Sequence, residues 1–401
     1  MIKRFKLPML AGALALLIAS PASAQNTVLD QNKVGAALAI LFITDDGGLP
    51  VLPGGHVGSP ALPIITSAIV TNTSVTDSVI LHGEIISGDT GDLWTGDSFT
   101  CNMTPGETTQ FVFSPLGAGS LLKTECSDGD AQPLDGKDNK SNPKNVPNDA
   151  QKGILWLTIS TAAFPPGGTL YQNILEGKSV VFNFNDGTAY EVGAVPFQSP
   201  DPGMANFDNN WQFNGLELAR FPESLTASFH APSNGVSAAG TPVPGLVLRT
   251  TLILFVLDGR LSSTLTPNAE ALLFFFNDDE EFFDTNVSVD CFRMVDLETL
   301  DGRFTAALLG SPTGHLEIIP QSVDPADENH DSTFGDDDNQ RWVGILGWIV
   351  QKLEGGAQIM DAQNMVYPAT GNANDSAFGS LLSTSLSPLP NAGADIPTLR
   401  P

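Results

Sequence analysis

The chain has 401 residues, of which 16% are charged, and its formal net charge is −27. This excess of negative charge argues against docking on nucleic acid or on anionic lipid, because both partners are themselves polyanions. It predicts colloidal solubility outside the cell, and alternatively the binding of divalent cations.

The first predicted element is a secretory signal peptide over residues 1–24. Lys3 and Arg4 begin a basic segment, "LPMLAGALALLIAS" is a short apolar core, and "PASA" ends in an Ala22-x-Ala24 cleavage pattern. No later run has the roughly 18 apolar residues that a spanning helix needs. We therefore expect an exported protein without a membrane span, located in the periplasm, outside the cell or on its surface.

The mature chain reads as strands separated by turns. Apolar residues alternate with a period of two, and clusters of Gly, Pro, Asn and Asp separate the runs. "NAEALLFFFN" contains three consecutive phenylalanines and fits a buried strand better than a helix. The other candidate strands are, in chain order, "AALAILFIT", "SAIVTNT", "SVILHGEII", "TTQFVFS", "GILWLTIS", "SVVFNF", "AYEVGAV" and "LTASFH".

The stretch "TSAIVTNTSVTDSVILHGEII" (66–86) predicts a strand–turn–strand unit. Alternation would hide either Ala68 and Val70 or Ile69 on the buried face of a sheet. Asn72 and Asp77 bracket the turn, where their side chains can bond the local backbone. Two antiparallel sheets packed face to face would bury such faces and form a sandwich.

The second half of the chain repeats the order of the first. "ALAILFIT" is answered by "TTLILFVL", "TSAIVTNTS" by "AEALLFFFND", "DSVILHGEIIS" by "TNVSVDCFRMVD" and "GILWLTIS" by "GHLEIIPQS". The tripeptide Leu175-Glu176-Gly177 recurs as Leu353-Glu354-Gly355. We expect two tandem immunoglobulin-like β-sandwich domains related by internal duplication, at residues 25–235 and 236–401, with a Pro/Gly-rich linker near 231–245.

Four segments resemble a group of uncharacterised secreted proteobacterial proteins with "VNT[ST]", "WTG" and "PTxGHxEII" motifs. They are "IVTNTS" (69–74), "DLWTGDSFTC" (92–101), "GTAYEVGAVPFQ" (187–198) and "SPTGHLEIIP" (311–320). The chain departs from the group in having Pro320 where an acid is usual. The resemblance supports the all-β architecture and implies no activity.

Three cysteines are present in a chain expected to meet an oxidising compartment. Cys101 and Cys126 flank one segment and are the predicted disulfide pair. Cys291 would be left over, as a small apolar residue buried in a strand.

Several residues invite a catalytic or binding interpretation. Ser98 in a Gly-Asp-Ser block, with Asp327 and His330, has the outline of a GDSL-type esterase, but no helix is predicted after the serine. None of the five histidines forms an HExxH or HxH pattern, and His82 and His315 are expected to be structural or solvent-facing and not ligands. Trp94 and Trp211 lie in polar stretches and are candidates for a sugar-stacking surface, whereas Trp156 is expected in the core.

Carboxylates cluster in three stretches, around 128–138, 278–284 and 324–338. Calcium takes six to eight oxygen ligands, which loops rich in Asp and Asn can supply, although no stretch has EF-hand spacing. A solvated acidic loop is the simpler interpretation. If calcium binds, the predicted ligands are Asp324, Asp327, Asp331, Asp336, Asp337 and Asp338.

The sequence favours a non-enzymatic exported protein with a structural or adhesive role at the bacterial cell envelope, without a cofactor unless calcium is bound. Its partners would be cell-surface or extracellular polymers, or further copies of the chain. Two alternatives stay open: a secreted module that binds calcium or carbohydrate, and a secreted hydrolase that uses Ser98 or carboxylates.

Overall fold

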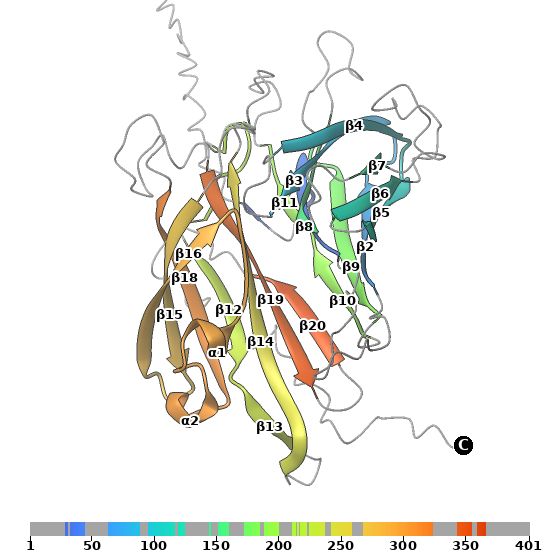
Figure 1. Ribbon diagram of the computed structural model, residues 1–401. Coiled ribbons are helices and arrows are strands. Elements are labelled where there is room, and N and C mark those ends of the chain that lie inside the picture. Colours follow the sequence, from blue (N-terminus) through green and yellow to red (C-terminus); the bar gives the residue numbers. More distant parts are fainter. Residues whose placement is uncertain are drawn as a thin grey trace, which may run out of the picture.

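The computed structural model describes residues 29–30, 33–44, 63–88, 95–116, 119–124, 144–145, 151–159, 172–184, 188–199, 211–213, 215, 217–222, 224–236, 242–258, 268–323, 343–354 and 359–365. In these residues the chain forms four β-sheets (Figure 1). The signal peptide predicted over 1–24 lies outside the described residues.

The first half of the chain supplies two sheets. Sheet I contains, in spatial order, β11 (Val195–Phe197), β1 (Ala37–Ile43), β8 (Lys152–Ile159), β3 (Val79–Ser87) and β4 (Thr95–Met103). Sheet II contains β10 (Thr188–Gly193), β9 (Leu175–Asn183), β2 (Ile64–Asn72), β5 (Thr108–Leu116), β6 (Gly119–Thr124) and β7 (Lys144–Asn145).

The second half supplies the other two sheets. Sheet III contains β12 (Leu225–His230), β18 (Thr313–Val323), β15 (Asn268–Asn277) and β16 (Phe282–Asp290). Sheet IV contains β13 (Ser233–Val236), β14 (Pro242–Asp258), β19 (Val343–Glu354) and β20 (Ile359–Asn364), and β17 (Phe292–Asp296) also pairs with β14. The strand pairs among the described residues are antiparallel, so the predicted all-β fold is confirmed.

The described helices are two single turns, α1 (Leu297–Leu300) and α2 (Ala306–Leu309). Neither one has the length or apolar character that crossing a membrane as a helix requires.

Sheets I and II pack face to face around one apolar core. Phe42 on β1 stacks on Phe113 of β5, with ring centroids 4.3 Å apart, and Phe99 on β4 lies 5.5 Å from Phe111 of β5. Alternate residues of β1 and β8, among them Leu38 and Leu155, join the same core. Burying both inner faces removes apolar surface from water, which is the main favourable term in folding.

The predicted strand–turn–strand unit connects these two sheets. β2 belongs to sheet II and β3 to sheet I, and Ala68 and Val70 are the residues that face the core. The predicted turn chemistry is confirmed for Asn72, whose Nδ2 donates to the Asp77 carbonyl at 2.8 Å and whose Oδ1 accepts from Ser74 N at 3.1 Å. The Asp77 carboxylate instead accepts from the hydroxyls of Ser74 and Thr76, and Asp77 N donates to Ser74 Oγ at 2.9 Å. These local bonds satisfy backbone groups where the chain crosses between sheets.

Sheet I is buried on its second face as well, by an aromatic group that we call the joint cluster. It consists of Trp156, Phe197, Trp211, Phe213 and Phe221, and neighbouring rings have centroids 4.4–6.5 Å apart. Phe221 also packs on Gly344 of β19, where a Cβ would lie 2.0 Å from the ring. The core of the second half is therefore continuous with the outer face of sheet I.

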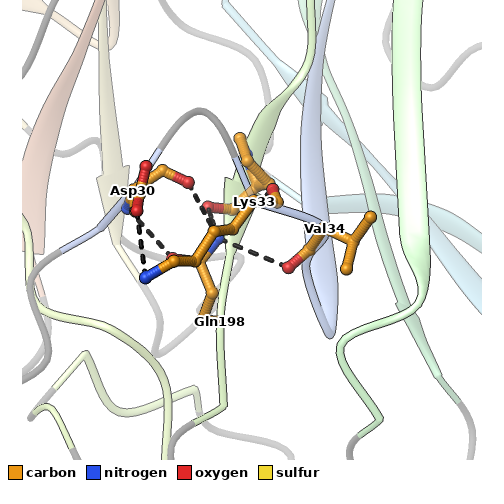
Figure 2. Close-up of polar contacts among 5 residues, drawn as sticks. Asp30, Lys33, Val34 and Gln198 are labelled. Atoms are coloured by element: carbon orange, nitrogen blue, oxygen red, sulfur yellow. Dashed lines mark hydrogen bonds and ion pairs between the residues drawn. The ribbon is translucent and has the colours of Figure 1, made fainter.

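Gln198, directly after β11, holds the first described segment of the chain in place (Figure 2). Its Oε1 accepts from Asp30 N at 3.0 Å, and its Nε2 donates to the Asp30 carbonyl at 3.0 Å. The same nitrogen lies 3.5 Å from the carbonyl oxygens of Lys33 and Val34 and 3.3 Å from that of Pro196. A side chain amide that is both donor and acceptor suits this position, where backbone groups of both kinds are buried.

The structure corrects three of the predicted correspondences between the halves. "DSVILHGEIIS" forms β3, which lies in the sheet of β1 and pairs with β4 and β8, whereas "TNVSVDCFRMVD" spans β16, which pairs with β15, and β17, which pairs with β14. β8 pairs with β1, whereas β18 pairs with β15 and not with β14. "GILWLTIS" and "GHLEIIPQS" therefore do not occupy equivalent places. The repeated Leu-Glu-Gly is also not equivalent, because Leu175 begins β9 whereas Glu354 ends β19.

The chain passes from sheets I and II to sheets III and IV before it reaches the predicted linker. β12 precedes residue 236 and β13 ends at it, yet they pair with β18 and β14 of the second half. The change from one pair of sheets to the other thus lies between β11 and β12. The independence of the segments 25–235 and 236–401 as domains stays a prediction.

Candidate functional site

The outer face of sheet III carries the exposed ring of Phe282 beside the half-buried rings of Phe274 and Phe276 and is the candidate site. Residues of β15 alternate between core and solvent, so that Leu273 and Phe275 are buried while the residues between them face outward. We call the outward surface the aromatic face and define it by Leu272, Phe274 and Phe276 of β15, Phe282 of β16 and Ile319 of β18.

The registers of the three strands place these residues in rows. His315, Phe276 and Phe282 form one row, and Glu317, Phe274 and Asp284 form the next. The Phe282 ring lies 5.2 Å from that of Phe274 and 5.4 Å from that of Phe276. Phe282 is 53% exposed. Three adjacent rings on a solvent-facing sheet are unusual in a soluble protein, whose large exposed apolar patches tend to mark interaction sites.

Carboxylates border the rings on both sides. Asp284 and Glu317 are the direct cross-strand neighbours of Phe274, and such neighbours have Cβ atoms about 4.5–5.5 Å apart. Burial lowers the pKa of His315, and the nearby Glu317 carboxylate opposes this shift. The pKa of His230, at the end of β12, is lowered by burial in the same way, against the opposing effect of Asp278. At neutral pH the histidines beside the face are therefore uncharged, and its charge is negative.

The turn between β15 and β16 contains the acidic residues 278–281 and lies at one end of sheet III. Asn277 Oδ1 accepts from Asp279 N at 3.0 Å and from Glu281 N at 2.7 Å. Asp278 Oδ2 accepts from Thr313 Oγ1 at 2.6 Å, which ties the turn to the beginning of β18. These hydrogen bonds fix the conformation of the turn, and they stabilise it against the repulsion among its acidic side chains.

Arg303 covers part of the edge of sheet III. It donates to the main-chain carbonyl of Asp284 on β16, which pairs with β15 alone among the described strands. Its Nη2 lies 2.6 Å from Asp301 Oδ2, and the guanidinium stands 5.5 Å from the Phe275 ring centroid. The hydrogen bond from Arg303 lowers the pKa of Asp301.

The predicted calcium ligands Asp324, Asp327, Asp331, Asp336, Asp337 and Asp338 lie outside the described residues. Within the described part of the chain, no group of three or more His, Cys, Asp or Glu side chains is placed to hold a metal ion. Calcium binding by 324–338 stays a prediction.

Cys101 is buried in β4 and is disulfide-bonded. Its predicted partner Cys126 lies outside the described residues, so the pairing stays a prediction. Cys291 is a free, buried thiol, as expected, and burial raises its pKa to about 11. It has a positive φ of 58° at the point where the chain leaves β16 for β17.

Of the proposed esterase residues, only Ser98 is described. It lies inside β4, opposite Glu84 of β3, and residues 104–107 lead directly into the next strand, β5. A serine nucleophile at the sharp turn between strand and helix would need a different local structure. Asp327 and His330 lie outside the described residues, and the hydrolase alternative stays a prediction.

Two predictions about aromatic residues are corrected. Trp211 was expected at the surface but is only 9% exposed, because it packs on Trp156. Phe274 and Phe276 were expected in the core but face outward, and of the three consecutive phenylalanines only Phe275 is fully buried. Trp156 is in the core as predicted, and Trp94 lies outside the described residues.

The sequence contains the pattern that produces the aromatic face, but consecutive apolar residues obscure it. In "ALLFFFNDDEEFFDTNV", residues 271–276 are all apolar, so the sequence does not show which of them face the core and which face solvent. The acids of 278–281 mark the turn, and the period of two on either side places every second phenylalanine on the outer face.

Comparison of the chain with models of protein families and with curated proteins gave no match.

Proposed function

We propose that this is a non-enzymatic exported protein with a structural or adhesive role at the bacterial cell envelope, and that it attaches to its partner through the aromatic face. The observation that carries the proposal is the exposure of Phe282 beside Phe274 and Phe276 on the outside of a sheet. Leaving Phe282 exposed and Phe274 and Phe276 only half-buried forgoes part of the stabilisation of about 1.5–3 kcal/mol that full burial of each side chain would give. A partner that covers them would recover part of it.

The rigidity of the frame supports a mechanical role. The joint cluster connects the core of one half to the core of the other, so load applied to sheet III passes through packed side chains to sheets I and II. Close packing transmits strain because interiors contain few voids. A protein that holds two surfaces at a fixed separation would need this property.

We also propose that the halves are immunoglobulin-like sandwiches related by internal duplication. The support is a correspondence that keeps both chain order and pairing: β1, β2, β5, β8, β9 and β11 match β14, β15, β16, β17, β18 and β19. β1 pairs with β8 and β11, as β14 pairs with β17 and β19. β2 pairs with β5 and β9, as β15 pairs with β16 and β18.

The role at the envelope can be tested by fractionating the bacterium that carries the gene. We expect the full chain to lose residues 1–24 and to be retained with the envelope, and the double change Phe274→Ser with Phe282→Ser to release it into the medium. Phe182→Ser with Phe184→Ser is the matched control, because these exposed rings stack on the outside of sheet II. A chain that diffuses freely without any substitution would contradict the proposal.

A further inference from the structure

The aromatic face combines two features that select for the same kind of ligand. Phe274 stands between Glu317 and Asp284 in one cross-strand row, so an aromatic ring and two carboxylates lie side by side. A cation over the face of a ring is attracted by its negative quadrupole, and the flanking carboxylates add Coulombic attraction. Neither feature would favour an anionic ligand.

The neighbouring rows provide apolar surface but no competing positive charge. One row contains Phe276 and Phe282, and the other contains Leu272 and Ile319. Lysine and arginine are absent from all three rows in the registers described for sheet III. Arg303, at the edge of β16, forms its ion pair with Asp301, and it also attracts the Asp284 carboxylate electrostatically. Because the Arg303 ion pair is made with Asp301, we take both carboxylates of the central row as able to meet a partner.

A second copy of the chain does not suit this surface. Each copy brings a formal net charge of −27, so two copies repel one another while they approach. The occupant should instead carry positive charge on stems that can lie along apolar surface. Arginine does both, since its guanidinium stacks on aromatic faces and forms two parallel hydrogen bonds with a carboxylate.

We infer that the aromatic face binds an extended, arginine- or lysine-bearing segment of a partner polypeptide, with one cationic side chain over Phe274 between Glu317 and Asp284. This inference rests on the proposed function and names the chemistry of its partner. The methylene stems of the cationic residues would cover Leu272, Phe276 and Phe282, as long charged side chains commonly do on apolar surfaces.

The inference is tested by titrating the full chain with a labelled peptide of alternating serine and arginine, at about 0.15 M salt. The Asp284→Asn/Glu317→Gln variant should bind it at least 10-fold more weakly than the unchanged protein. The matched control, Glu176→Gln/Glu191→Gln, removes the same charge from the outer face of sheet II and should change the affinity less than 2-fold. A similar loss in both variants would mean attraction to the overall charge and would overturn the inference.

Two further probes examine the role of the ring. Phe274→Leu should weaken binding roughly 3-fold, the size expected of one exposed cation–π contact. A peptide with citrulline in place of arginine keeps the shape without the charge and should not bind. Binding of the citrulline peptide, or of a neutral oligosaccharide, with equal affinity would overturn the inference in favour of another class of partner.

The same variants separate this inference from the proposed function. If Asp284→Asn/Glu317→Gln stays on the envelope while the phenylalanine variant is released, the attachment surface stands and the cationic partner is wrong. If the unchanged protein is not retained at all, the proposed function fails whatever the peptide does. The substituted side chains face outward, and thermal unfolding of each variant checks that its fold is intact.

Discussion

Gln198 illustrates how a single buried side chain can hold two distant segments together. Its Oε1 accepts from Asp30 N, and the two N–H groups of its Nε2 lie among the backbone carbonyls of residues 30, 33 and 34 (Figure 2). The carbonyl of residue 196 is 3.3 Å from the same nitrogen. The residue is 4% exposed, so water cannot replace these bonds. A buried polar group that loses its partner costs about 1–3 kcal/mol.

We expect Gln198→Glu to lower the free energy of unfolding by about 3 kcal/mol at neutral pH. The carboxylate is nearly isosteric and can still accept from Asp30 N, but it cannot donate to the carbonyls that surround it. The measurement is the midpoint of urea unfolding.

Gln110→Glu is the matched control for this change. Gln110 Nε2 donates to Ser67 Oγ at 2.6 Å on a part-buried surface of sheet II. The serine hydroxyl can rotate and donate to the new carboxylate, so we expect a loss below about 1 kcal/mol. Equal losses in the two variants would mean that Gln198 holds nothing in place.

At the scale of the strand, glycines allow phenylalanine rings to lie across their neighbours. Gly83 of β3 is the cross-strand partner of Phe99 on β4, and a Cβ at Gly83 would lie 2.3 Å from the end of that ring. The ring cannot easily move, because it is buried against Phe111 of the opposite sheet. Gly314 of β18 and Phe229 of β12 repeat this arrangement in the second half.

We therefore expect Gly83→Ala to destabilise the protein by about 1–3 kcal/mol through overpacking. Gly302→Ala is the control, since a Cβ there would meet nothing within 4 Å and should change stability by less than about 0.5 kcal/mol. Thermal unfolding of both variants measures the difference. A neutral Gly83→Ala would show that the Phe99 ring is not held by its neighbours.

Arg303 protects the edge of sheet III, and its removal should expose a strand that can pair with another molecule. Edge strands present unpaired backbone groups, and natural proteins cover or charge them to prevent association. We expect Arg303→Ala to increase dimers and larger species in sedimentation velocity. Lys178→Ala removes the same charge from the exposed Lys178–Glu191 pair and should leave the protein as it was. If both variants sediment like the unchanged protein, Arg303 does not prevent association through the edge strand β16.

The strands were predictable from sequence because the alternation that marks a strand is local. The sheet to which each strand belongs was not predictable from sequence. Alternation in "SAIVTNTS" and the Asn72–Asp77 turn indicated β2, the turn and β3. That β2 and β3 enter different sheets depends on contacts far along the chain, such as Phe42 with Phe113. The same limit explains Trp211, whose polar neighbours in sequence suggested exposure although Trp156 covers it. The candidate site could be derived only once the register had placed Asp284 and Glu317 beside Phe274.

At the scale of the whole molecule, 45 acidic residues against 18 basic ones leave much uncompensated charge. The calcium hypothesis for 324–338 predicts that chelation with EGTA lowers the melting temperature and that added calcium restores it, because a ligand of the native state stabilises it by mass action. Magnesium at the same ionic strength controls for screening alone. An unchanged melt after chelation would exclude calcium as a structural ligand.

We expect the joint cluster to make the two halves depend on each other for stability. Phe213 is fully buried, and its ring centroid lies 4.4 Å from that of Phe221, 5.1 Å from that of Phe197 and 6.0 Å from that of Trp156. Because Phe221 packs on Gly344 of β19, a cavity at Phe213 weakens the support of both halves at once.

We expect the intact chain to unfold in one calorimetric transition and Phe213→Ala to lower its free energy of unfolding by about 3–5 kcal/mol. Amide exchange should then become faster in β8 of sheet I and in β19 of sheet IV together. Phe182→Ala, at an exposed ring of sheet II, is the control and should affect neither strand. If Phe213→Ala does not fold, Phe213→Leu leaves a smaller cavity and tests the same coupling. Faster exchange confined to one half would show that the halves are stable independently and that the shared apolar core does not couple them.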